Sequence, residues 1–219
     1  MQNIPRLFIN QDLETGKIIS VDKNIVHYLR HVMRRSDCLV FNNGIEYNAA
    51  LSDDDKNMMI GNKTEHVDPS NDLILCFAPI KKIDELLNMV TQLGVGTLQP
   101  VITERTVARH INWERMIKII TEASEQSGRN CIPKLLSPVN FKELSWQGML
   151  VADERAAHGK NIKETTQKCK KIFVGPEGGF SPQEFEIMDR AGVHSLSLGK
   201  TILRAEVAAV VAVSKVIDK

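Results

Sequence analysis

Two short segments near the end of the chain constrain its fold more than any others. The first, residues 174–184, ends an apolar run in a glycine-rich turn and leads directly into a helix start. There Ser181 is a good N-cap, Pro182 suits the first helical position, and Glu184 completes a capping box. The second, residues 198–207, repeats the order of strand, glycine, turn and helix. The two units place glycine-containing loops at strand ends, where open α/β sheets bind ligands.

Strand and helix patterns alternate through the last two thirds of the chain. Alternation of this kind predicts an α/β domain with a mostly parallel, buried sheet. We expect strands at 73–77, 97–101, 149–152, 171–174 and 195–198, and helices at 83–93, at 112–127, from 182 and from 205.

The first 65 or so residues have a different pattern, with short strand segments and one short helix near residues 26–33. Asn43-Gly44 between two apolar stretches is a strong hairpin signal, because the turn needs positive φ at both positions. A small β-barrel is the expected result. The polar segment 66–72 contains a proline and marks the boundary, so the domains are expected at 1–69 and 70–219.

The composition is that of an ordinary globular protein, with 42% hydrophobic residues in 219 and a net charge of +1. No global positive field indicates nucleic acid, so any RNA-binding surface must be local. The four cysteines are far apart, which favours reduced thiols in a cytosolic protein over a zinc site or disulfides. His27 and His31 have metal-ligand spacing, but Tyr28 stands where the metalloprotease motif needs Glu, so no metal is expected. Neither a signal peptide nor a membrane span is expected.

The loop at 175–179 has the glycines that allow a backbone to approach a cofactor closely. Alone it would fit an ordinary tight turn, and the second loop and the capped helix favour function. Gly199-Lys200 lacks the glycine five residues earlier that a phosphate-binding P-loop needs, since His194 stands there. The dinucleotide fingerprint is also absent.

Several charged residues stand at the ends of these elements. Glu206 would complement the dipole of the last helix, whereas Arg204 at the same end is better explained by an anionic partner. Arg105 follows a strand and fits a substrate contact or a solvated charge pair equally well. Arg129 follows a helix C-cap. Arg34, with its neighbours Arg30 and Arg35, forms a basic patch suited to RNA phosphates or to a solvated helix face.

The chain resembles the RsmE-type bacterial 16S rRNA uridine-N3 methyltransferases of the SPOUT class. The resemblance covers nearly the whole chain and is carried by 5–8, 27–34, 43–44, 104–105, 125–130, 175–179 and 198–208. It implies a PUA-like RNA-binding β-barrel at 1–69 and a SPOUT methyltransferase domain with a C-terminal trefoil knot at 70–219. It also implies S-adenosylmethionine as cofactor, a homodimer with the active site at the subunit interface, 16S rRNA in the 30S subunit as partner, and a cytoplasmic location.

The resemblance assigns roles to individual residues. The catalytic residues would be Arg204, Arg105 and Glu206, with Glu177 as the alternative to Glu206 in proton removal and Arg129 of the partner subunit as a further cation. The target would be N3 of uridine 1498. Cofactor binding would fall to Val174, Gly175, Pro176, Glu177, Gly178, Gly179, Leu198, Gly199, Ile202, Leu203 and Ala208. RNA contacts would come from Arg6, Arg30, Arg34, Arg129 and Asn130.

Five positions depart from the family pattern, namely Asn43, Met89, Gln92, Lys200 and Val207. They leave two alternatives open. One is a methyltransferase of the same class acting elsewhere, for example on a ribose 2′-oxygen in tRNA. The other is an RNA-binding assembly factor that keeps the fold without the activity.

Overall fold

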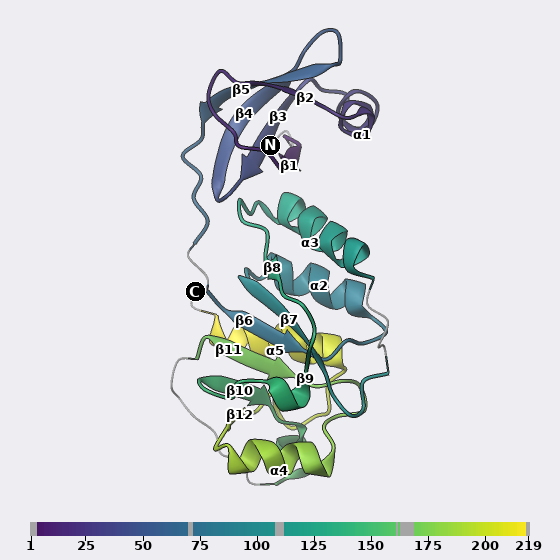
Figure 1. Cartoon of the computed structure of the whole chain (residues 1–219), viewed down its shortest axis with the longest axis vertical. Helices are drawn as coiled ribbons and strands as arrows, with labels where there is room; N and C mark the ends of the chain where they lie inside the picture. The colour runs from purple at the N-terminus through teal and green to yellow at the C-terminus, as the bar shows by residue number, and fades with distance from the viewer. Residues whose placement is uncertain (1–3, 70–71, 108–111, 161, 163–168, 218–219) are drawn as a thin grey trace. The chain divides into compact units, whose positions relative to one another are not determined.

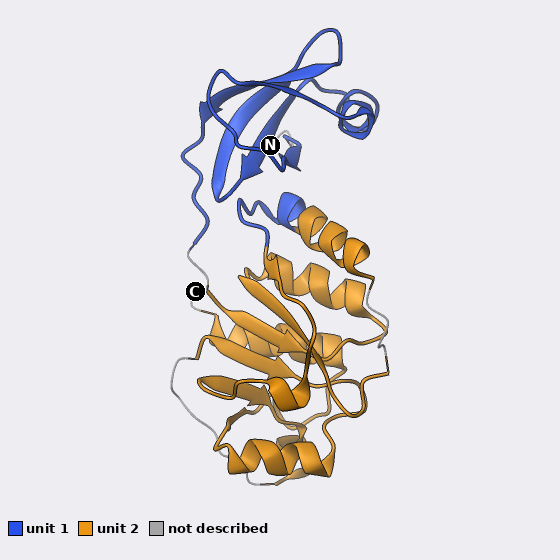
Figure 2. Ribbon diagram, viewed as in Figure 1, with its two compact units in different colours: residues 1–69, 124–132 blue, residues 70–123, 133–219 orange. Residues whose placement is uncertain are grey.

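The chain divides into two compact units that do not coincide with two continuous stretches of sequence. The computed structural model describes residues 4–69, 72–107, 112–160, 162 and 169–217. Unit 1 consists of residues 1–69 together with 124–132, and unit 2 of residues 70–123 and 133–219 (Figure 2). Unit 1 therefore includes a segment from the middle of the chain that the expected domain 1–69 lacks.

Unit 1 is built on a five-stranded sheet. Its elements are β1 (Arg6–Phe8), β2 (Ile18–Ser20), α1 (Lys23–His27), the π-helical η1 (Tyr28–Met33), β3 (Asp37–Asn42), β4 (Ile45–Leu51) and β5 (Asn57–Lys63). The strand order is β1-β3-β4-β5-β2, antiparallel except for the β1–β3 pair. Between β3 and β4, φ is 50° at Asn43 and 78° at Gly44, which confirms the expected hairpin turn.

Unit 2 is an α/β domain on an all-parallel sheet. Its elements are β6 (Ile74–Phe77), α2 (Ile83–Gln92), β7 (Thr97–Ile102), α3 (Trp113–Ser127), β8 (Lys134–Leu135), β9 (Val139–Asn140), the 3-10 turn η2 (Phe141–Glu143), β10 (Met149–Ala152), the 3-10 turn η3 (Glu154–His158), β11 (Lys171–Val174), α4 (Pro182–Arg190), β12 (His194–Leu196) and α5 (Ala205–Val216). The last residues of α3, from Ser124 on, belong to unit 1. The strand order is β12-β10-β11-β6-β7-β8, and β9 also pairs with β7 (Figure 1).

Both faces of the sheet in unit 2 are covered. Successive side chains of a strand point to opposite faces, and Ile172, Phe173 and Val174 of β11 are all buried. On one face Phe173 packs in a cluster with Phe141 of η2 and Met188 of α4. On the other, α5 packs against α2 and β11 and crosses behind the strands in Figure 1.

The elements of unit 2 that were expected from the sequence are confirmed, including the start of α4. The Ser181 side chain accepts the Glu184 N–H at 3.2 Å, and the Glu184 carboxylate accepts the Ser181 N–H at 2.9 Å. Strands β2, β8 and β9 were not expected from the sequence, because strands of two or three residues are too short to show a periodic pattern. The expected trefoil knot stays a prediction. Within the described residues no helix is long and apolar enough to cross a membrane.

Candidate cofactor and substrate site

The carboxyl ends of β10 and β11 and the segment after β12 surround one cavity in unit 2. Its volume is about 770 Å³, within the range of small-molecule sites of about 300–1,000 Å³. Both glycine loops contribute to its wall, and so do the expected catalytic residues. Every residue expected to bind the cofactor lines it, together with Arg105, Arg204 and Glu206. The two glycine loops, which are distant in sequence, thus meet in one site, as expected for loops at the strand ends of an open α/β sheet.

The glycine loop after β11 tolerates side chains poorly at two positions. A β-carbon on Gly175 would lie 3.0 Å from the ring of Phe180. Gly179 has φ of 67°, and a β-carbon there would overlap the carboxylate of Glu154. Gly178 is less restricted, since its nearest neighbour would be Cβ of Arg105 at 3.5 Å. The loop backbone is therefore packed closely at its first and last glycines.

Arg105 is held against this loop by its side chain and by its own backbone segment. Its Nη1 donates to the carbonyl oxygen of Gly178 at 2.8 Å. The preceding residue, Glu104, donates its N–H to the Glu184 carboxylate at 2.8 Å. Since Glu184 also caps α4, the helix start and the Arg105 segment share one carboxylate. Arg105 therefore has a defined position at the cavity.

Arg204 and Glu206 begin α5 on the cavity wall. Arg204 is the N-cap residue and is exposed, and its side chain forms no hydrogen bond or ion pair with any residue that the structure describes. Glu206 is only 5% exposed as a residue, and its side chain likewise has no such partner within the described ranges. Its carboxylate oxygens are not among the fully enclosed, unpaired side-chain atoms of the described residues, so they open onto the cavity. The helix dipole stabilises the charge of this carboxylate, and hydrogen-bond donors on a ligand in the cavity can reach it.

Several lining residues were not expected from the sequence. They are Lys81, Lys82, Ala152, Asp153, Glu154, Ala157, His158, Thr201 and Ala205. Asp153 and Glu154 directly follow the expected strand 149–152, which pairs in parallel with the strand carrying the glycine loop. Neighbouring parallel strands end at the same edge of a sheet, so this position was a signal that could have found them.

Asp153 is a buried anchor beneath the cavity. It accepts the Ser195 hydroxyl at 2.7 Å and the guanidinium of Arg155 at 2.8 Å. Arg155 also donates to Asp189 at 2.9 Å and stacks over the ring of Phe185. This guanidinium holds the pKa of Asp189 below its usual value. Arg155 thus links η3 to α4 through its ion pair with Asp189.

Arg6, expected to contact RNA, has an internal role in unit 1. Its guanidinium pairs with buried Glu46 at 2.7 Å and donates to the Asn130 side chain at 2.5 Å. It also reaches the carbonyl oxygens of Ser124, Glu125 and Arg129, at the end of α3 and just beyond it, at 3.3 to 3.5 Å. All its donor groups are engaged and only 12% of its side chain is exposed, which argues against RNA contact.

Asn130 belongs to the same internal network. It is buried, and its amide donates to the carbonyl oxygen of His66 at 3.2 Å. Its backbone N–H donates to Asp68 at 2.8 Å. The expected RNA contact at Asn130 is therefore replaced by a structural role. Arg129 is partly buried, and burial lowers the pKa of its guanidinium.

Arg30 and Arg34 remain at the surface of unit 1. Arg30 pairs with Asp55 at 2.8 Å and donates to the carbonyl oxygen of Ser52. Arg34 is exposed, with φ of 55° at the end of η1, and forms no ion pair within the described residues. Of the expected RNA contacts, Arg34 is the cation best placed to meet a phosphate.

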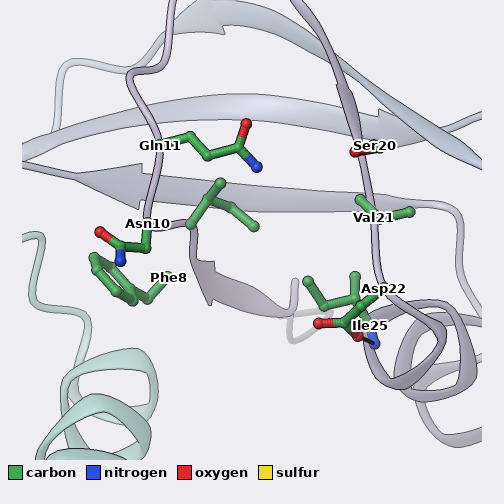
Figure 3. A pocket seen from close by; sticks show the side chains of 8 residues that line it. Phe8, Asn10, Gln11, Ser20, Val21, Asp22 and Ile25 are labelled. Atoms are coloured by element: carbon green, nitrogen blue, oxygen red, sulfur yellow. Dashed lines mark hydrogen bonds between the residues drawn. The ribbon is translucent and has the colours of Figure 1, made fainter.

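Unit 1 has a second hollow of about 560 Å³ between the segment after β1 and the start of α1 (Figure 3). Its lining residues are Phe8, Ile9, Asn10, Gln11, Ser20, Val21, Asp22 and Ile25. Asp22 is already used as the N-cap of α1. The lining contains no lysine or arginine, so this hollow is poorly suited to an anionic ligand. In the described part of the chain no group of three or more His, Cys, Asp or Glu side chains could hold a metal ion.

Comparison with known proteins gives the class that this fold and site define. A family model described as an RNA methyltransferase domain matches residues 68–217, which include the whole cavity. Among curated proteins, ribosomal RNA small subunit methyltransferase E of Rickettsia conorii is 34% identical, over 96% of this chain and 94% of that one. The protein of the same name from Mesomycoplasma hyopneumoniae is 27% identical, over 97% and 98% of the two chains.

Solved structures agree. Ribosomal RNA small subunit methyltransferase E of Neisseria gonorrhoeae, crystallised with S-adenosyl methionine, superposes with a TM-score of 0.83 at 27% identity, covering 97% of this chain and 96% of that one. The chain belongs to the ribosomal RNA small subunit methyltransferase E family, within the RNA methyltransferases of the SPOUT class.

Proposed function

We propose that this protein transfers the methyl group of S-adenosylmethionine to N3 of a uridine of 16S rRNA, the one numbered 1498 in the related family. The observation that carries the proposal is the convergence of both glycine loops with Arg105, Arg204 and Glu206 on one cavity. Family membership supports rRNA methylation in general. The methylated atom, N3, and the nucleotide, uridine 1498, are what we propose in addition.

The cavity suits S-adenosylmethionine in size and in its backbone lining. A relative of 27% identity was crystallised with this molecule. The close packing at Gly175 and Gly179 brings loop backbone to the cavity wall, where N–H and C=O groups can bind a nucleoside. When bound, this cofactor supplies a methyl group on a positively charged sulfur.

Cations are needed to stabilise the negative charge that develops on the uracil when its N3 becomes a nucleophile. N3 of uracil carries a proton and is a poor nucleophile until the proton leaves, after which negative charge spreads onto O2 and O4. Guanidinium groups placed beside those oxygens stabilise the charge as it develops. Arg204 has no partner among the described residues and is free to take this role. Arg105, fixed against Gly178, is the second such cation.

Glu206 is the third residue that we assign to the reacting centre. Its carboxylate has no partner within the described ranges. Placed beside the reacting base, it would accept the N3 proton or hold the base in line with the methyl group. Alignment of methyl and nucleophile is itself a large part of catalysis.

We propose the 30S subunit as the partner and a cytoplasmic homodimer as the working form, both by similarity to the family. In this arrangement Arg34 of unit 1 contacts RNA phosphates, and Arg129 of the partner subunit adds a cation at the active site. Arg30 contributes less, because Asp55 already neutralises it.

The direct test is methylation of 30S subunits prepared from cells that lack the mark, followed by mass spectrometry of the digested rRNA. The proposal predicts one N3-methyluridine per subunit, at position 1498, with cofactor present. A methyl group on a ribose oxygen would favour the alternative target class. No methylation and no cofactor binding by folded protein would favour the RNA-binding assembly factor.

A further inference from the structure

Glu154 is a cavity residue to which neither the sequence nor the proposed chemistry gives a role. It is the second residue after β10 and opens η3, beside the loop that follows β11. The Glu154 carboxylate and the glycine loop therefore follow two neighbouring strands, β10 and β11. Its backbone position is fixed by Asp153 on one side and Arg155 on the other, both tied into the network with Ser195 and Asp189.

The carboxylate of Glu154 is pressed against the glycine loop. Its Oε1 accepts the N–H of Phe180 at 3.1 Å, and a side chain on Gly179 would overlap that same oxygen. Arg105 donates to the carbonyl oxygen of Gly178 in the same loop. The Gly178–Phe180 backbone is therefore hydrogen-bonded by both a cation and an anion.

Glu154 lacks a neutralising charge of its own. It forms no ion pair with any residue that the structure describes, and the adjacent guanidinium of Arg155 is committed to Asp153 and Asp189. Partial burial raises the pKa of Glu154, with the carboxylate of Asp153 adding to the effect. A half-buried carboxylate with unused acceptor capacity, on a cavity wall, gains stability from hydrogen-bond donors on a ligand.

The position of Glu154 indicates which group of the ligand donates hydrogen bonds to its carboxylate. In doubly wound α/β sheets that bind dinucleotides, an acidic side chain about 20 residues after the glycine-rich turn accepts a hydrogen bond from a ribose hydroxyl. Glu154 likewise stands beside a glycine loop at the end of the neighbouring strand, although it precedes that loop in the chain. A carboxylate beside the sulfonium would instead stabilise a positive charge that disappears on methyl transfer, which would oppose the reaction.

We propose that Glu154 binds the ribose hydroxyls of the cofactor and so fixes the nucleoside beside the glycine loop. This inference rests on the proposed function, because it takes a nucleoside cofactor as the ligand. Gly179 is then glycine for two reasons, its positive φ and the room that the Glu154 carboxylate needs. Glu154 is a binding and positioning residue, and no step of the reaction passes through it.

The test is calorimetric titration of the full-length protein with ligands that differ only in the ribose. The probes are S-adenosylhomocysteine, S-adenosylmethionine and the 2′,3′-dideoxy form of S-adenosylhomocysteine. The variant is Glu154→Gln, which keeps an oxygen for the Phe180 N–H and removes the charge. Glu186→Gln, on the exposed face of α4 away from the cavity, is the matched control.

Removing a hydrogen bond to a charged acceptor weakens binding about 10-fold or more. Glu154→Gln should therefore bind S-adenosylhomocysteine and S-adenosylmethionine about 10-fold more weakly, by the same factor, and the dideoxy ligand as wild type does. The Glu186→Gln control should match wild type for all three. Equal weakening for ribose and dideoxy ligands, or a larger loss for S-adenosylmethionine, would overturn the ribose contact while leaving the proposed function intact. If folded wild-type protein binds none of the ligands, both proposals fall.

Discussion

The two units differ in how well their candidate site residues could be identified from the sequence. In unit 2, residues from two loops and three charged positions meet in one cavity. In unit 1, two of the five expected RNA contacts, Arg6 and Asn130, are internal and bond to each other. A site built on backbone loops at strand ends follows from the fold. The role of an arginine depends on partners that are distant in sequence, here Glu46 and residues 124–130.

The largest effect of the proposed substitutions is expected at Arg6 in unit 1. Arg6→Ala removes one partner of a buried ion pair and leaves Glu46 uncompensated. We expect the free energy of unfolding to fall by about 3–5 kcal/mol. Urea unfolding followed by circular dichroism measures it. Arg34→Ala, at an exposed arginine of the same unit, should unfold like wild type. If Arg6→Ala keeps full stability but loses RNA affinity, the internal role assigned here is wrong.

Arg204 is the counterpart in unit 2, an arginine without an internal partner in the described residues. Arg204→Ala should lower kcat by about 10²–10³, the usual loss for one donor to a developing negative charge. Stability and S-adenosylhomocysteine affinity should change little, since the Arg204 side chain makes no hydrogen bond with the described residues. Single-turnover methylation of unmethylated 30S subunits measures the rate. Lys200→Ala, a cation in the same loop outside the cavity lining, is the control, and equal rates for both variants would contradict this assignment.

Arg105 should give a mixed result, because it both lines the cavity and holds the glycine loop. Arg105→Ala removes the hydrogen bond to the Gly178 carbonyl oxygen, so the cofactor KM should rise up to about tenfold in addition to a fall in kcat. Steady-state kinetics with varied cofactor separate the two parameters. A fall in kcat with unchanged KM would show that the loop does not depend on Arg105.

The smallest effect is expected at Arg34 in unit 1. Arg34→Ala should weaken binding to 30S subunits only a few-fold, and the slope of log affinity against log salt should become shallower by about 0.7–0.9 for one lost phosphate contact. Arg30→Ala should change the slope less, since Asp55 already pairs with Arg30. Filter binding across a range of salt concentrations gives both slopes. If the two slopes change equally, the distinction drawn between these arginines does not hold.

The sequence predicted the backbone framework better than the side-chain roles. The capping box at Ser181 and Glu184, the turn at Asn43-Gly44 and the long strands are local features, and each is confirmed. The contribution of residues 124–132 to unit 1 was missed, because long-range contacts such as that between Arg6 and Asn130 leave no periodic signal. Glu154 was missed although it directly follows an expected strand. The role proposed for it also requires that β10 and β11 be neighbours, and the order of strands does not follow from the sequence.

The cavity of unit 2 is proposed to bind S-adenosylmethionine, and calorimetric titration is the decisive measurement. We expect one saturable site per chain for S-adenosylmethionine and for S-adenosylhomocysteine. Binding should be retained in Arg34→Ala and lost in Gly178→Trp, whose indole would be placed on the cavity wall beside Arg105. Circular dichroism would establish that each variant is folded. Absence of binding by folded wild-type protein, or full binding by Gly178→Trp, would contradict the account.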